Sequence, residues 1–179
     1  MFEKMDLTPV AIRVLTHLAR SRGKEYYQRE LARSLDMSLG GCHSALARLE
    51  EMGLVERRES GKNVYYRISG SNPSVGFFKV FVSIQELHPL VERLKTLCRR
   101  IVLFGSCARG DDTLESDIDL LVVTEDTTAT RRIIPSKVGG RQLKLVLVTP
   151  GELLLMKEKD PAFYEESGKG IVLWREEDG

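Results

Sequence analysis

The chain has 179 residues, 42% of them hydrophobic and 30% charged, and a formal net charge of +1. This composition is ordinary for one globular domain or for two small ones. Charge is unevenly distributed, because residues 1–70 hold 12 Lys and Arg against 9 Asp and Glu, and residues 71–179 hold 15 against 17. The mildly basic first part permits nucleic-acid binding.

Two features of the sequence bear on its compartment. No apolar run approaches the length of a membrane span, and the first residues, MFEKMDLTPV, lack the apolar segment of a secretory signal. Cys42, Cys98 and Cys107 are scattered and form no paired motif, which fits a reducing compartment. We therefore expect a cytoplasmic protein without a membrane partner.

The first 70 residues predict three helices and a hairpin. The first helix has Thr8 as its N-cap and Pro9 in its first turn, and the third begins after Ser38 and ends at Gly53. Apolar spacing places the helices over residues 9–19, 30–35 and 39–52, and the hairpin strands over residues 54–59 and 64–69. This order of elements indicates a winged helix-turn-helix domain.

Residues 46–54, LARLEEMGL, with Gly61 and Tyr65-Tyr66, resemble the winged-helix domains of bacterial and archaeal transcription regulators. The resemblance implies that the third helix enters the major groove of double-stranded DNA and that the hairpin follows the backbone or minor groove. The residues it places toward DNA are His43, Ser44, Arg48, Arg57, Arg58 and Lys62. The alternative is a winged helix that binds protein or dimerises.

Two adjacent glycines, Gly40 and Gly41, stand near the start of the third helix. Each costs roughly 1 kcal/mol relative to alanine in a helix interior. The pair therefore predicts either a start that frays or a close approach of the backbone to its target.

Residues 71–99 form a helical connector between the two halves. Residues 75–87 are unusually apolar, and Pro89 is expected to separate them from a second helix that ends at Arg99-Arg100. Such an apolar segment must be covered, either between the two domains or in a homodimer that spans two DNA half-sites.

Residues 101–123 predict two buried strands around a polar segment. Side chains alternate along a strand, so Asp117 and Asp119 share one face. Neighbouring carboxylates repel unless a cation lies between them, and Mg²⁺ is the expected ion because it binds carboxylates and substrate phosphates. The Gly105-Ser106 turn lets the backbone approach a phosphate, so the segment predicts a metal and phosphate site.

Gly105-Ser106, Ala108-Arg109-Gly110 and residues 116–120, SDIDL, resemble the signature of minimal nucleotidyltransferases of the DNA polymerase beta superfamily. The resemblance implies that Ser106 binds the triphosphate of an NTP, that Asp117 and Asp119 hold Mg²⁺ and serve catalysis, and that a hydroxyl acceptor attacks the α-phosphate. The acceptor would belong to a protein or a small molecule. Arg109 would assist with phosphates or pair with Asp111 or Asp112.

The rest of the chain predicts a strand over residues 143–148, two helices after Pro150 and Asp160, and a last strand over residues 171–174. We expect an α+β protein, with a winged helix-turn-helix over residues 1–70 and a nucleotidyltransferase-like α/β domain with a mixed sheet over residues 100–179.

One position separates two functional hypotheses. Members of the resembled family usually carry a third carboxylate on an adjacent strand, and here that position falls at or beside Lys144, with no Asp or Glu between Asp126 and Glu152. The first hypothesis is a Mg²⁺-dependent nucleotidyltransferase coupled to DNA recognition. The second is a DNA-binding transcription regulator whose transferase-like domain has lost turnover and senses nucleotide or is structural. An ion pair between Lys144 and the aspartates would favour the second.

Overall fold

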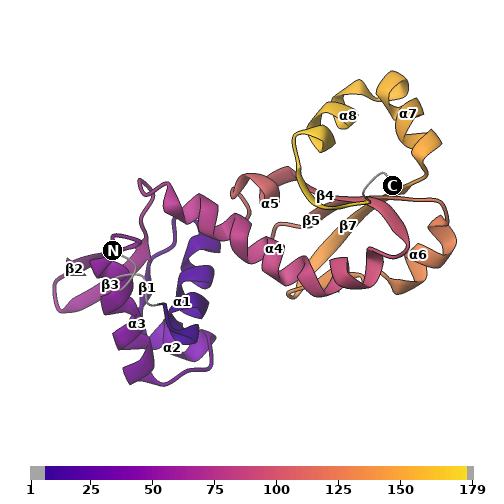
Figure 1. Cartoon of the computed structure of the whole chain (residues 1–179). Helices are drawn as coiled ribbons and strands as arrows, with labels where there is room; N and C mark the ends of the chain where they lie inside the picture. The colour runs from indigo at the N-terminus through magenta and orange to yellow at the C-terminus, as the bar shows by residue number, and fades with distance from the viewer. Residues whose placement is uncertain (1–6, 177–179) are drawn as a thin grey trace. The chain divides into compact units, whose positions relative to one another are not determined.

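A computed structural model describes residues 7–176, and the chain divides into two compact units, Met1–Lys79 and Val80–Gly179 (Figure 1). The boundary lies inside one helix, α4 (Ser74–Leu94). No helix of the described residues is both long and apolar enough to cross a bilayer. Each unit has its own hydrophobic core.

The first unit is the expected winged helix-turn-helix. Its elements are α1 (Pro9–Arg20), β1 (Tyr26–Tyr27), α2 (Gln28–Ser34), α3 (Leu39–Glu51), β2 (Val55–Ser60) and β3 (Asn63–Ile68). The strands form an antiparallel sheet in the order β1-β3-β2. Leu15, Leu31 and Leu46, one from each helix, are fully buried in the core. The short β1 strand was not predicted.

The caps of α1 and α3 lie where the sequence predicts them. The Thr8 hydroxyl accepts a hydrogen bond from the Ala11 backbone N–H (3.2 Å), and the Ser38 hydroxyl accepts one from the Gly41 N–H (3.1 Å). A Cβ at Gly41 would lie 3.0 Å from the Ser38 Oγ. Gly41 therefore makes room for the cap of its own helix, while Gly40 has open space around it.

Helix α4 corrects two predictions about the connector. It runs without a break through Pro89, so the expected second helix is part of the same one. Arg99 and Arg100 do not end a helix but lie in β4 (Cys98–Phe104). A proline removes one intrahelical hydrogen bond, and burial of Leu87, Leu90 and Leu94 on both sides of it holds the helix together.

The second unit is a five-stranded mixed sheet in the order β6-β7-β5-β4-β8. Its elements after β4 are α5 (Gly105–Arg109), β5 (Ile118–Thr124), α6 (Thr127–Ile133), β6 (Lys137–Val138), β7 (Arg141–Val148), α7 (Pro150–Lys159), α8 (Pro161–Gly168) and β8 (Ile171–Arg175). Strands β5 and β7 are parallel, and the other neighbours are antiparallel. Residues 105–109, expected as a turn, form a short helix.

The two faces of this sheet carry different helices (Figure 1). Leu120 and Val122 of β5 pack into a cluster with residues of α4 and α6. Leu121 and Val123 pack on the other face against α7 and α8, through Leu153, Met156 and Phe163. Because side chains alternate along a strand, Asp119 lies on the α7–α8 face.

Candidate functional site

The candidate site of the second unit begins where β4 ends. Gly105 follows directly, with a φ of 67°, a backbone conformation that favours glycine. A Cβ at Gly105 would lie only 2.3 Å from the Asp119 Oδ2. The Gly-Ser segment is therefore packed directly against the second aspartate of the SDIDL motif, which brings the two predicted motifs together.

Asp119 lies in β5 and is half-buried, while Asp117 precedes the strand. Burial raises the pKa of the Asp119 carboxyl above its ordinary value. The positive charge of Lys144 opposes this rise, and the negative charge of Asp117 adds to it. The two aspartates are thus close enough to interact electrostatically, as the alternation of the sequence predicts.

Lys144 lies beside these carboxylates on the neighbouring strand. In the parallel register of β5 and β7, Lys144 is the partner of Asp119. The Lys144 Nζ donates to the Asp117 Oδ2 at 2.8 Å, and this bond raises the pKa of Lys144. The ammonium group of Lys144 therefore lies at or beside the position at which members of the resembled family usually carry a third carboxylate.

Lys144 sets these residues apart from the Mg²⁺ site with two carboxylates that the sequence predicts. Mg²⁺ prefers octahedral coordination by oxygen atoms, and here one of the two carboxylates already pairs with an ammonium group. Within residues 7–176, no three Asp, Glu, His or Cys side chains are grouped so that they could hold a metal ion. Both predicted donors, Asp117 and Asp119, are present, and the ammonium group of Lys144 is the difference from the predicted magnesium site.

Arg109 extends from α5 toward acidic side chains. Its Nε lies 3.3 Å from the Asp111 Oδ2, which agrees with one of the two alternatives from the sequence, and its Nη1 lies 3.5 Å from the Glu166 Oε1. Glu166, from α8, was missed by the sequence reasoning. Its charge also raises the pKa of Asp119. No local pattern marks Glu166, since only the packing of α8 on the sheet brings it here.

A buried ion pair anchors the loop between α5 and β5. Arg141, the first residue of β7, donates to the Asp112 Oδ2 at 2.8 Å and to the Glu86 Oε2 at 2.8 Å. Arg141 also donates to the Cys107 Sγ at 3.3 Å, so this thiol is a buried packing group. The sequence signal for this pair is the second aspartate of Gly110-Asp111-Asp112, which the sequence suggests only as a partner of Arg109.

The predicted DNA-binding residues lie in the first unit. His43 and Ser44 are exposed on α3, and Lys62 is exposed at the turn between β2 and β3. Arg48 pairs with Glu51 at 3.0 Å. Arg57 pairs with Glu59 at 2.5 Å, and Arg58 pairs with Glu25 at 2.5 Å. The arginines of this set are therefore already engaged by carboxylates.

The fold and the two sites define a two-domain protein. Comparison with known families agrees, because residues 5–63 match the MarR family and residues 87–167 match the nucleotidyltransferase domain. The chain is a MarR-type winged helix-turn-helix domain followed by a nucleotidyltransferase domain. No curated protein matches the chain.

Solved structures resemble about half of the chain. A possible transcriptional regulatory protein from Mycobacterium bovis is 26% identical, with a TM-score of 0.38, over 46% of this chain and 84% of that chain. A homodimeric winged helix-turn-helix DNA-binding domain from the same organism is 26% identical, with a TM-score of 0.39, over 48% and 75%. The MepR–DNA complex of S. aureus is 19% identical, with a TM-score of 0.42, over 53% and 77%.

Proposed function

We propose that this chain is a DNA-binding transcription regulator. Its nucleotidyltransferase domain binds a nucleoside triphosphate but does not transfer the nucleoside monophosphate to an acceptor. The observation that carries the second half is the Lys144–Asp117 ion pair, in the register where Lys144 faces Asp119. The first half is supported by the match to the MarR family and by the exposed polar face of α3.

Lys144 supports nucleotide binding as well as the loss of turnover. Its side chain is 67% exposed, so the ammonium group that neutralises Asp117 is also accessible to a ligand. A triphosphate near Ser106 would meet the positive charges of Lys144 and Arg109. We therefore expect nucleotide to bind at this site without a divalent cation.

The proposed role has consequences for compartment and assembly. The three cysteines are free and buried, which fits the reducing cytoplasm expected for a regulator. Double-stranded DNA is the proposed partner of the first unit. The homodimer stays a prediction, and the exposed Phe77 and Phe81 of α4 are the residues at which sedimentation analysis of variants would test it.

A second candidate function is the Mg²⁺-dependent transfer of a nucleoside monophosphate to a protein or small-molecule acceptor. It is favoured by the family match over residues 87–167 and by the packing of Gly105 against Asp119, because the two signature motifs meet in space.

Nucleotide binding with and without metal separates the two candidates. Filter binding of labelled ATP, GTP, CTP and UTP is measured in EDTA and in Mg²⁺, together with pyrophosphate release. We expect binding that persists in EDTA, weakens about tenfold in Lys144→Gln through loss of a charged hydrogen bond to phosphate, and is kept in Lys144→Arg. Lys137→Gln, which removes an exposed lysine of β6, is the matched control.

Binding that requires Mg²⁺, with pyrophosphate release that Asp117→Asn and Asp119→Asn abolish, would establish the second candidate and reject the first. Absence of nucleotide binding in every condition would reject the sensing role. Retained binding of duplex DNA in that case would leave a regulator with a structural second domain.

A further inference from the structure

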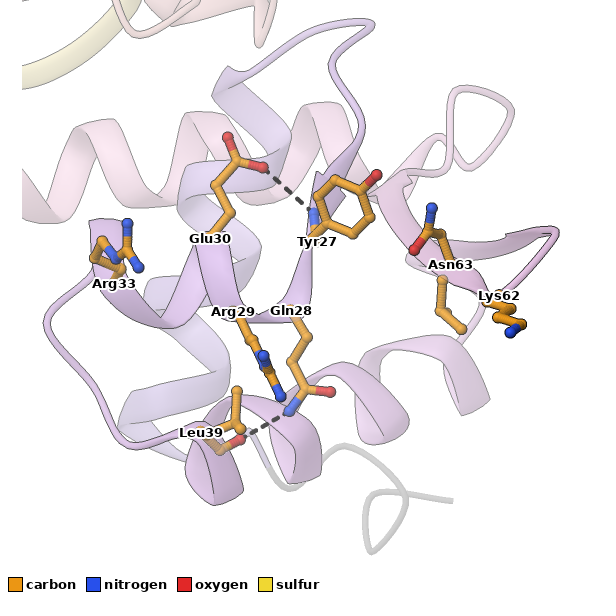
Figure 2. Close-up of a pocket in the computed structure, with 9 residues that line it drawn as sticks. Tyr27, Gln28, Arg29, Glu30, Arg33, Leu39, Lys62 and Asn63 are labelled. Carbon is orange, nitrogen blue, oxygen red and sulfur yellow. Dashed lines mark hydrogen bonds between the residues drawn. The ribbon is translucent and has the colours of Figure 1, made fainter.

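An open groove of about 740 Å³ lies in the first unit between α2, the start of α3 and the turn of the wing (Figure 2). Figure 2 shows Arg29 and Arg33 on the helical side and Lys62 on the wing side. Of these three cations, only Lys62 is among the residues that the sequence resemblance places toward DNA. The groove therefore adds helix α2 to the surface that can meet a ligand.

The cations of the groove differ from those of the wing strands. Arg29, Arg33 and Lys62 are exposed, and none of them forms an ion pair within residues 7–176. The three arginines of the wing strands each pair with a glutamate, namely Arg57 with Glu59, Arg58 with Glu25 and Arg67 with Glu56. The wing strands are thus neutralised locally, while the groove keeps its positive charge.

One carboxylate, that of Glu30, also lines the groove. Its Oε2 accepts the backbone N–H of Tyr27 at 3.4 Å, so it caps the start of α2 (Figure 2). Three cations against one carboxylate leave the lining positive. Such a surface attracts a polyanion.

Gln28, which lines the groove, contacts two residues of α3, the helix expected to enter the major groove of DNA. The Gln28 Nε2 donates to the Leu39 carbonyl at 3.0 Å, and the Gln28 Oε1 lies 3.4 Å from the His43 Nδ1. The start of α2 is therefore held against the start of α3. A duplex whose major groove receives α3 would bring a phosphate strand across α2 and the wing tip.

We propose that the phosphate contacts of this domain are made by Arg29, Arg33 and Lys62 around the groove, and that Arg57 and Arg58 keep their glutamate partners in the complex. The inference rests on the proposed DNA-binding function and names the residues that carry it. The ligand is double-stranded DNA, held through its backbone and therefore without regard to sequence at these contacts.

Salt-dependent binding of a short duplex of mixed sequence tests the proposal. Fluorescence anisotropy with the full chain gives the slope of log affinity against log salt, to which each phosphate contact contributes about 0.9. Arg29→Gln/Arg33→Gln should lower that slope by about 2 and weaken binding at low salt. Arg131→Gln/Arg132→Gln removes the same charge from two exposed arginines of the second unit and should leave the slope unchanged. The wing strands are tested by the same measurement with Arg57→Gln/Arg58→Gln.

The conservative variant Arg29→Lys/Arg33→Lys should keep the wild-type slope, and thermal unfolding checks that each variant is folded. Equal slopes for wild type and Arg29→Gln/Arg33→Gln, or a loss confined to Arg57→Gln/Arg58→Gln, would overturn the groove as the phosphate site while leaving DNA binding intact. A wild-type chain that binds no duplex DNA would instead reject the proposed function itself.

Discussion

Gly105 is held to glycine by two separate constraints, its positive φ and the Asp119 carboxylate beside it. Backbone strain alone makes a left-handed alanine cost roughly 1–2 kcal/mol. We expect Gly105→Ala to destabilise the second unit by more than that in urea denaturation. Gly140→Ala is the matched control, because Gly140 has a φ of 81° and open space around its Cβ position. Equal losses in the two variants would contradict the packing described for Gly105.

His17 is predicted to make the first unit sensitive to acid. Burial lowers the pKa of His17 below its ordinary value of 6.5. The His17 ring packs edge-on against the ring of Tyr26, with 5.2 Å between the two ring centroids. The unfolded chain therefore takes up the proton first, so stability is full above pH 6.5 and falls as the pH drops below it.

Thermal unfolding on both sides of that pH measures the effect. His17→Phe, which keeps an aromatic ring and cannot titrate, should lose the acid dependence in this range. His88→Gln, which replaces an exposed histidine, should keep it. An identical pH profile for wild type and His17→Phe would show that His17 is not the titrating group.

At the scale of elements, β7 is tied to the loop before β5 by the Arg141–Asp112 pair. The Asp112 side chain is 0% exposed and that of Arg141 is 6% exposed. Removing one partner of such a pair costs about 3–5 kcal/mol, because a buried charge loses its compensation. We expect Arg141→Met to lower the free energy of unfolding by that amount in urea.

Arg99→Met is the comparison, because Arg99 pairs with Glu125 at the surface, with side chains 58% and 63% exposed. Exposed pairs contribute about 0–1 kcal/mol. The double variant Arg141→Met/Asp112→Leu should recover part of the loss. Similar costs for Arg141→Met and Arg99→Met would mean that the buried pair does not anchor the loop.

The elements also show which features of the fold follow from local sequence. Caps and apolar spacing predicted α1 and α3, because Thr8 and Ser38 act through neighbours three residues away. The continuity of α4 through Pro89 was missed, since burial in the second core outweighs the local effect of proline. Local sequence predicts elements well and predicts their ends poorly where packing decides.

The residues of the candidate site likewise include some that the sequence predicts and others that only tertiary packing brings together. Alternation along β5 predicted that Asp117 and Asp119 lie together, and alignment with the resembled family predicted that Lys144 falls beside them. Glu166 and the Asp112–Arg141 pair could not be predicted, because their partners lie 57 and 29 residues away in the chain. Only the tertiary packing of α8 and β7 creates those contacts.

At the scale of the whole molecule, each compact unit has its own proposed function, namely DNA binding in the first and nucleotide binding in the second. The division between Lys79 and Val80 falls inside the expected connector, residues 71–99, because α4 contributes side chains to both cores. The phosphate contacts proposed for the first unit and the nucleotide binding proposed for the second involve separate sets of residues. Each can therefore be removed by substitution without touching the residues of the other.

Counting bound Mn²⁺ by electron paramagnetic resonance tests the proposal that Lys144 takes the place of a metal ion at the Asp117–Asp119 pair. The wild-type chain should bind no more Mn²⁺ than Asp117→Asn/Asp119→Asn does, and Lys144→Glu, with a carboxylate at that register position, should bind an additional ion. A wild-type chain that binds an additional ion, lost in the double aspartate variant, would show instead that the aspartate pair holds a metal ion beside Lys144.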